Sequence, residues 1–237
     1  MLWMVALGAA QDPAATLVSS VANGVNEAPV STAVRLLLTF TGLSFLPAML
    51  LVMTPFVRFV VVLSMLRQAL GMSQSPPNQV IIGLSMFLSL LVMEPCLTVA
   101  YNQGVGPFLA GDMAPMDAWN QAIEPIRGFM LANTRKADML TMLQIADMPR
   151  PDSLKDLSTA MVTSAFVLSE LKTAMVISIY VFVPFLVIDL VTASVLMGLG
   201  MMMLPPTTIS LPFKMMVFVL TDGWGLLVRD MVQGIAR

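Results

Sequence analysis

The ionisable side chains of this 237-residue sequence that could form a functional centre lie within or beside apolar stretches. They are Glu170, Lys172, Asp189 and Lys214, and charges in such surroundings normally face a protein interior or an aqueous path. An ammonium at the depth of Lys214 needs a carboxylate, which Glu170 or Asp189 of the same or a neighbouring subunit could supply. In the alternative, the Lys214 side chain extends its charged end to water. We expect these four charges to be buried or to lie between subunits.

Catalysis finds little support in the sequence. There is no His, which removes the commonest general base and the commonest metal ligand. Acidic pairs such as Asp138 and Asp147 come without a nucleophile motif or a Gly-rich phosphate loop, so we expect a solvated acidic face. The single Cys96 lies in an apolar run and is expected to be a packing residue. We predict no enzyme, no cofactor and no metal site.

The elements that must position the charges are long and apolar. Of all residues, 57% are hydrophobic and 11% charged, and the mean hydropathy is +0.86. Soluble domains have roughly 45–50% apolar and about 25% charged residues. Four apolar blocks reach or approach the ~20 residues of a membrane-spanning helix; they cover residues 33–66, 80–99, 173–204 and 211–228. We predict an all-α membrane protein, and its net charge of -2 offers no basic surface to nucleic acid.

Two of these blocks are too long for a simple span. As one helix, residues 173–204 would extend about 48 Å, whereas the hydrocarbon core of a bilayer is about 30 Å thick. Tilt absorbs only part of this excess, which leaves a break at Pro184 or helices that project beyond the lipid and are covered by other subunits. The charges of Arg58, Glu94 and Asp189 within the blocks favour other subunits.

The order of polar and apolar segments predicts four regions. Residues 1–30 are a leader or a mobile N-terminal tail, because their first part is apolar and ends in small residues, as a signal peptide does. Residues 31–100 form a first helical hairpin and residues 166–237 a second. Between them, residues 101–165 form a helical insertion with more acidic than basic residues, whereas Arg67 marks the preceding turn as cytoplasmic. The insertion is therefore expected to be extracytoplasmic, in the periplasm.

The two hairpins read as an internal repeat with an offset of 129 residues. Each contains Pro-Phe, an apolar helix, the pattern Gly-Met-x-x-x-Pro-Pro and a second apolar helix. Glycine at a helix C-terminus admits a left-handed residue, and the paired prolines stop the helix from resuming before the chain has reversed. The predicted turn residues are Gly71, Pro76 and Pro77 in the first hairpin, and Gly200, Pro205 and Pro206 in the second.

The second turn differs from the first in polarity. Residues 72–79 of the first turn are mostly polar, whereas the second contains Met201, Met202 and Met203. Methionine is unbranched and polarizable, so a ring of such turns could form a compliant seal that excludes water and ions. The alternative is that the turn only packs against its surroundings.

Several short strings of the sequence are specific enough to identify relatives: LRQALG (66–71), PPNQ (76–79), SELKTA (169–174), PFLVIDL (184–190), GMMMLPP (200–206), LPFK (211–214) and DGW (222–224). On these strings, from about residue 30 to the C-terminus, the chain resembles the FliP family of flagellar type III export-gate proteins. Related injectisome proteins share the methionine turn and Leu-Pro-Phe-Lys, but the paired prolines after the methionines, Ser-Glu-Leu-Lys and Asp-Gly-Trp are similar to the flagellar proteins.

The resemblance implies a helical, ring-like complex in which five copies of the chain assemble with FliQ and FliR. The complex is expected in the bacterial inner membrane, within the flagellar basal body and beside other export-apparatus proteins. It would conduct unfolded axial proteins, with the methionine turn as its gasket. An injectisome counterpart is one alternative. Another is an ion-coupled secondary transporter that uses Asp189 and Glu94 as ion or proton sites.

Overall fold

The computed structural model describes residues 51–72, 74–149, 157–201 and 204–235, with separate positions between 34 and 49. Its regular structure is helical, and no strand occurs among these residues, which confirms the all-α class. The predicted leader or tail, Met202 and Met203 lie outside the described residues. The helices are α3 (Phe56–Ala69), α4 (Asn78–Ala100), the π-helical η1 (Tyr101–Val105), α5 (Gly106–Ala110), α6 (Pro115–Asn133), α7 (Lys136–Ile145), α8 (Thr159–Gly198), α9 (Pro206–Leu220) and α10 (Gly223–Gln233).

The chain separates into two compact units, residues 1–49 and 50–237. In the first unit, the described positions are helical and exposed. There the Ser44 hydroxyl donates to the carbonyl of Phe40, one turn earlier, at 2.8 Å. All the helices named above belong to the second unit, which the rest of the description concerns.

The longest element is α8, with 40 residues and a length of about 60 Å at 1.5 Å per residue. The Ser158 side chain caps its N-terminus by accepting from the Met161 amide. Pro184 lies inside the helix, so of the two explanations offered for the length of this block, the break at Pro184 is wrong. A proline removes one backbone hydrogen bond, but apolar surroundings favour a continuous helix because the remaining backbone groups need internal partners. The expected region boundary after residue 165 falls within α8.

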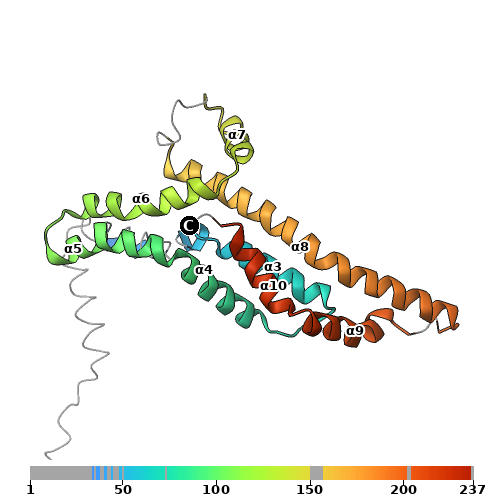
Figure 1. The fold of residues 1–237 in the computed structure, drawn as a ribbon. Coiled ribbons are helices and arrows are strands. Elements are labelled where there is room, and N and C mark those ends of the chain that lie inside the picture. Colours follow the sequence, from blue (N-terminus) through green and yellow to red (C-terminus); the bar gives the residue numbers. More distant parts are fainter. Residues whose placement is uncertain are drawn as a thin grey trace, which may run out of the picture. The chain divides into compact units, whose positions relative to one another are not determined.

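A first apolar core joins α3 to α8, α9 and α10. Phe59, Val62, Leu63 and Leu66 recur at helical spacing on one face of α3, and all four are buried. In Figure 1, α3 and α10 run beside α8. Their partners in this core include Ala174, Ile177 and Phe185 of α8, Phe218 of α9, and Leu227 and Met231 of α10.

A second core joins α6, α7 and the first turns of α8. Met130, Val162 and Phe166 are fully buried in it, and the Phe129 and Phe166 rings meet edge to face with centroids 6.1 Å apart. η1 approaches α6 closely, because a Cβ at Gly104 would lie 2.6 Å from a backbone carbonyl of α6. Because α4, η1 and α5 follow one another without a gap, the expected boundary after residue 100 falls inside a continuous helical segment.

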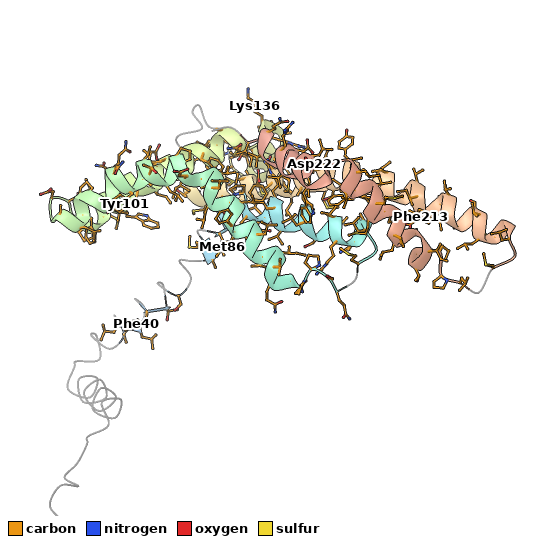
Figure 2. All side chains as sticks on the ribbon, turned by 60° about the horizontal axis from the view of Figure 1, so that its bottom comes forward. Phe40, Met86, Tyr101, Lys136, Phe213 and Asp222 are labelled. Atoms are coloured by element: carbon orange, nitrogen blue, oxygen red, sulfur yellow. The ribbon has the colours of Figure 1, made fainter. Side chains whose placement is uncertain are left out.

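Two helical segments in the described part of the chain are long and apolar enough to cross a membrane, Asn78–Ala110 and Thr159–Gly198. A third candidate exists if α9 and α10, which meet at 66°, form one broken span. Part of the first predicted block, before residue 51, lies outside the described residues, and the helix of this block in the second unit, α3, has 14 residues. Figure 2 labels Met86 and Phe213, two of the many exposed apolar side chains on the outer helix faces.

Candidate functional site

Among the described residues, three ion pairs hold helices of the second unit together, and the most buried joins α3 to α8. The side chains of Arg58 and Glu170 are 2% and 1% exposed. Arg58 Nε donates to Glu170 Oε2 at 2.8 Å, and Nη2 donates to Oε1, so the guanidinium binds the carboxylate with two parallel bonds. Its Nη1 donates to the carbonyl of Met231 in α10 at 3.3 Å. The pair therefore connects three helices.

The second ion pair joins α8 to α9. Lys214 Nζ lies 2.6 Å from Asp189 Oδ2, and it donates to the carbonyl of Ala69 at the end of α3 at 2.9 Å. The Ser210 hydroxyl donates to Asp189 Oδ1 at 2.5 Å. The Lys214 side chain is 3% exposed, so its charge is enclosed by protein rather than extended to water. Of the two carboxylates predicted for Lys214, Asp189 of the same chain is the partner.

The third ion pair fixes α7 on α8. Lys172 pairs with Asp138, whose side chain is 1% exposed. Beside it, the Arg135 amide donates to the Ser169 hydroxyl at 3.0 Å, and the Arg135 guanidinium donates to Thr173 at 3.1 Å. The expectation that Asp138 belongs to a solvated face is wrong. It lies where α7 packs on α8, and the Lys172 ammonium compensates its charge.

The structure thus brings Asp189 and Lys214 together, but gives Glu170 and Lys172 partners outside the predicted set. Sequence reasoning marked Arg58 as a charge in an apolar block without finding its partner, and it missed Ser210 and Asp138 as partners. The usable signal was the need of each buried charge for a counter-charge. Sequence position gave no guidance, because Arg58 and Glu170 are 112 residues apart.

The two glycine turns have the same local geometry. Gly71 has a φ of 78° and Gly200 a φ of 77°. At the end of α3, the Gly71 amide donates to the carbonyl of Gln68, and the Met72 amide donates to the carbonyl of Arg67. The same two hydrogen bonds, at the same spacing, are made by the amides of Gly200 and Met201 at the end of α8. This is the Schellman ending of a helix, which satisfies its last carbonyls. Pro77 is the residue before α4, and α9 begins at Pro206.

At the methionine turn, Met201 directly follows the left-handed Gly200 and is 39% exposed, and Leu204 is 46% exposed. An apolar cavity of about 450 Å³ lies between the last three turns of α8 and the first two turns of α9. Its lining includes Val187, Val191 and Phe213. The described side of the turn is thus apolar and open.

Taken together, the ion pairs and their hydrogen bonds hold the helices in register. Within the described residues, no group of three His, Cys, Asp or Glu side chains could hold a metal ion. The ion pairs use their charges on one another, and the surrounding surface is apolar. The described residues thus form a helical protein with segments long and apolar enough to cross a membrane, and its buried charges join its helices.

Comparison with known proteins gives the family. The model of the FliP family matches residues 38–231, and the chain belongs to that family. The chain is 49% identical over 200 residues to the flagellar biosynthetic protein FliP of Pectobacterium carotovorum subsp. carotovorum, covering 84% of this chain and 78% of the relative. It is 46% identical to the Bacillus subtilis (strain 168) protein of the same name, covering 86% and 92%. It is 42% identical to the protein of the same name from Caulobacter vibrioides (strain ATCC 19089 / CIP 103742 / CB 15), and the match covers 99% of this chain and 89% of the relative.

These matches confirm the resemblance seen in the sequence. They assign the chain to flagellum biogenesis and protein export, and its long apolar helices agree with a location in a membrane.

Proposed function

We propose that the chain is a core subunit of the flagellar type III export gate. Five copies assemble with FliQ and FliR into a helical, ring-like channel in the inner membrane, within the flagellar basal body. Unfolded axial proteins pass through the channel during flagellum assembly, beside other export-apparatus and basal-body proteins. The chain conducts these proteins and hydrolyses nothing. Family membership supports the flagellar assignment, and one structural observation supports the subunit role.

That observation is the exposed apolar surface of α8. Large apolar side chains that are at least 38% exposed occur from Leu171 to Leu199, a stretch of about 42 Å. To fit within a hydrocarbon core of about 30 Å, the helix would have to tilt by about 45°, beyond the usual range of roughly 0–40°. Part of this surface therefore needs a protein cover, which neighbouring copies and small apolar partners supply.

Within the gate, the turn that contains Met201–Met203 forms the gasket, and the turn of Gly71, Pro76 and Pro77 faces the cytoplasm. The matching Schellman endings at Gly71 and Gly200 support the proposal that the two hairpins are a repeat with one polar and one apolar turn. The insertion at residues 101–165 then lies on the periplasmic side.

The transporter alternative loses support at its proposed ion site. The Asp189 carboxylate has both oxygens engaged, one by Lys214 and one by Ser210. Glu94 is exposed on α4. The injectisome alternative is disfavoured by relatives that carry the flagellar name.

Co-purification tests the subunit role. The tagged full-length chain, expressed with FliQ and FliR at native level, should elute with both in a fixed ratio that survives size exclusion. A chain that elutes alone, or that transports ions alone in liposomes, contradicts the proposal.

Ion leakage tests the gasket. Replacing Met201–Met203 by Ala should leave secretion of axial proteins possible but raise passive leakage of small ions, because three smaller side chains close the path less well. The matched control replaces three exposed methionines elsewhere, Met86, Met116 and Met175, by Ala. If the gasket variant is as tight as the control, the methionines are not the seal.

A further inference from the structure

At the end of α3, Arg67 carries a charge that no described acidic residue compensates. Its Nη1 donates to the carbonyl of Pro76 at 3.1 Å and to Asn78 Oδ1 at 2.7 Å, both neutral acceptors in the turn before α4. Its Nε is buried and has no hydrogen-bond partner. One nitrogen thus fixes the guanidinium, and the edge formed by Nε and Nη2 has no partner among the described residues. The guanidinium therefore keeps a donor for an oxyanion at Nη2.

Arg67 also lines a cavity of about 160 Å³ whose other walls are apolar. The walls come from three helices: Leu63 and Leu66 of α3, Val80 and Leu84 of α4, and Trp224 of α10. An apolar cavity of about 150 Å³ accommodates a group the size of benzene, so this one has room for several methylene groups. A ligand that suits both parts has an oxyanion next to a hydrocarbon chain.

The cavity lies at the end of a candidate membrane span. Asn78, which accepts from Arg67, is the first residue of the apolar segment Asn78–Ala110. Arg at a helix end and Trp are residues that mark the level of lipid headgroups. From this level toward the middle of the candidate span, α4 carries exposed apolar side chains, among them Val80, which is 53% exposed, and Phe87, which is 65% exposed. Hydrocarbon placed in the cavity would continue along the outer face of α4.

We propose that this cavity is a binding site for an anionic phospholipid. The phosphate accepts from Nη2 of Arg67, and methylene groups next to the headgroup occupy the space beside Leu84 and Trp224. An acidic peptide from a partner protein would also neutralise Arg67. The lipid is the better fit because one molecule brings the oxyanion and the hydrocarbon to this level, and an apolar helix face continues from the cavity.

Lipid-selective quenching of Trp224 tests the proposal. The full-length chain with Trp3→Phe and Trp119→Phe keeps this tryptophan alone and is reconstituted into phosphatidylcholine vesicles that contain increasing fractions of brominated phosphatidylglycerol. We expect phosphatidylglycerol to be preferred by about fivefold, the factor for one basic residue beside an anionic lipid. In Arg67→Gln the preference should fall to about one. The matched control, Arg229→Gln, changes an exposed arginine of α10 outside this cavity and should keep the preference.

A second variant, Leu84→Phe, fills the cavity while Arg67 and its bonds to the turn remain. It should lower quenching by brominated phosphatidylglycerol even if Arg67→Gln proves to lose helix content by circular dichroism. Equal preference in the parent, Arg67→Gln and Leu84→Phe overturns the proposal. So does quenching that partner subunits abolish in the assembled complex, since a protein would then occupy the cavity.

Discussion

The buried pair of Arg58 and Glu170 gives the sharpest test of how this fold is held together. In Glu170→Gln the side chain keeps nearly its size, but the guanidinium, which is 2% exposed, loses its counter-charge. Breaking a buried pair from one side costs about 3–5 kcal/mol, because an uncompensated charge stays buried. Since the glutamine oxygen still accepts one bond, we expect about 3 kcal/mol, or a factor of about a hundred in the ratio of folded to unfolded protein.

The assay is equilibrium unfolding of the purified full-length chain in micelles, followed by circular dichroism. The double variant Arg58→Met with Glu170→Leu removes both charges and fills similar space, so it should recover most of the lost stability. As a control, Asp230→Asn removes an exposed carboxylate of α10 and should cost about 1 kcal/mol or less.

Two results would refute this reasoning. In the first, Glu170→Gln is as stable as Asp230→Asn, so the charge of Arg58 is not held away from water. In the second, the double variant loses as much stability as Arg58→Met and Glu170→Leu, made singly, lose together, so the two charges are not coupled. The Arg58 bond to the carbonyl of Met231 adds a second readout, because α10 should exchange its amide hydrogens faster in Glu170→Gln.

The same unfolding assay checks three further changes. Gly71→Ala should cost about 1–2 kcal/mol because alanine is strained at a φ of 78°, whereas Gly83→Ala, inside α4 with open space around it, should be neutral or stabilising. Gly223→Ala should lower the free energy of unfolding more than Gly71→Ala does, since its Cβ would lie 2.2 Å from the Phe218 ring. Equal losses would mean that α9 and α10 can move apart where they meet. Asp138→Asn should cost about 1 kcal/mol or less, because its lysine partner is half exposed and can be hydrated, and a loss comparable to Glu170→Gln would contradict this.

Local backbone chemistry and composition were the parts of this fold that the sequence could predict. The left-handed residues at Gly71 and Gly200 follow from glycine before paired prolines, a pattern only a few residues long. The helical class follows from the apolar blocks and the lack of strand-like alternation. In both cases the physical cause lies within the segment itself, so no knowledge of the packing was needed.

Partners across the fold could not be predicted in the same way. Arg58 meets Glu170 because α3 packs along α8, and Asp138 is buried because α7 packs on the same helix. These contacts depend on the rotation of each helix about its axis, which a nearly uniform apolar sequence leaves undefined. Pro184 is a similar case: its ring disfavours a helix locally, but the apolar segments on both sides favour an unbroken helix.

The ion pairs supply the rotational information that the apolar pattern of α8 lacks. At 100° per residue, Glu170 and Asp189 lie about 100° apart around the helix axis, and Ala174 and Phe185 lie between them, facing the core. The exposed apolar side chains of Val176, Tyr180, Val183 and Val187 lie about 220–280° around the axis from Glu170. If α8 turned about its axis to bury these exposed apolar side chains, Glu170 would move away from Arg58 and Asp189 away from Lys214. The two ion pairs therefore keep the exposed apolar side chains on the outer face of α8. A helix that is apolar all round thus presents one defined face to lipid or to neighbouring proteins, as the proposed assembly into an export gate would require.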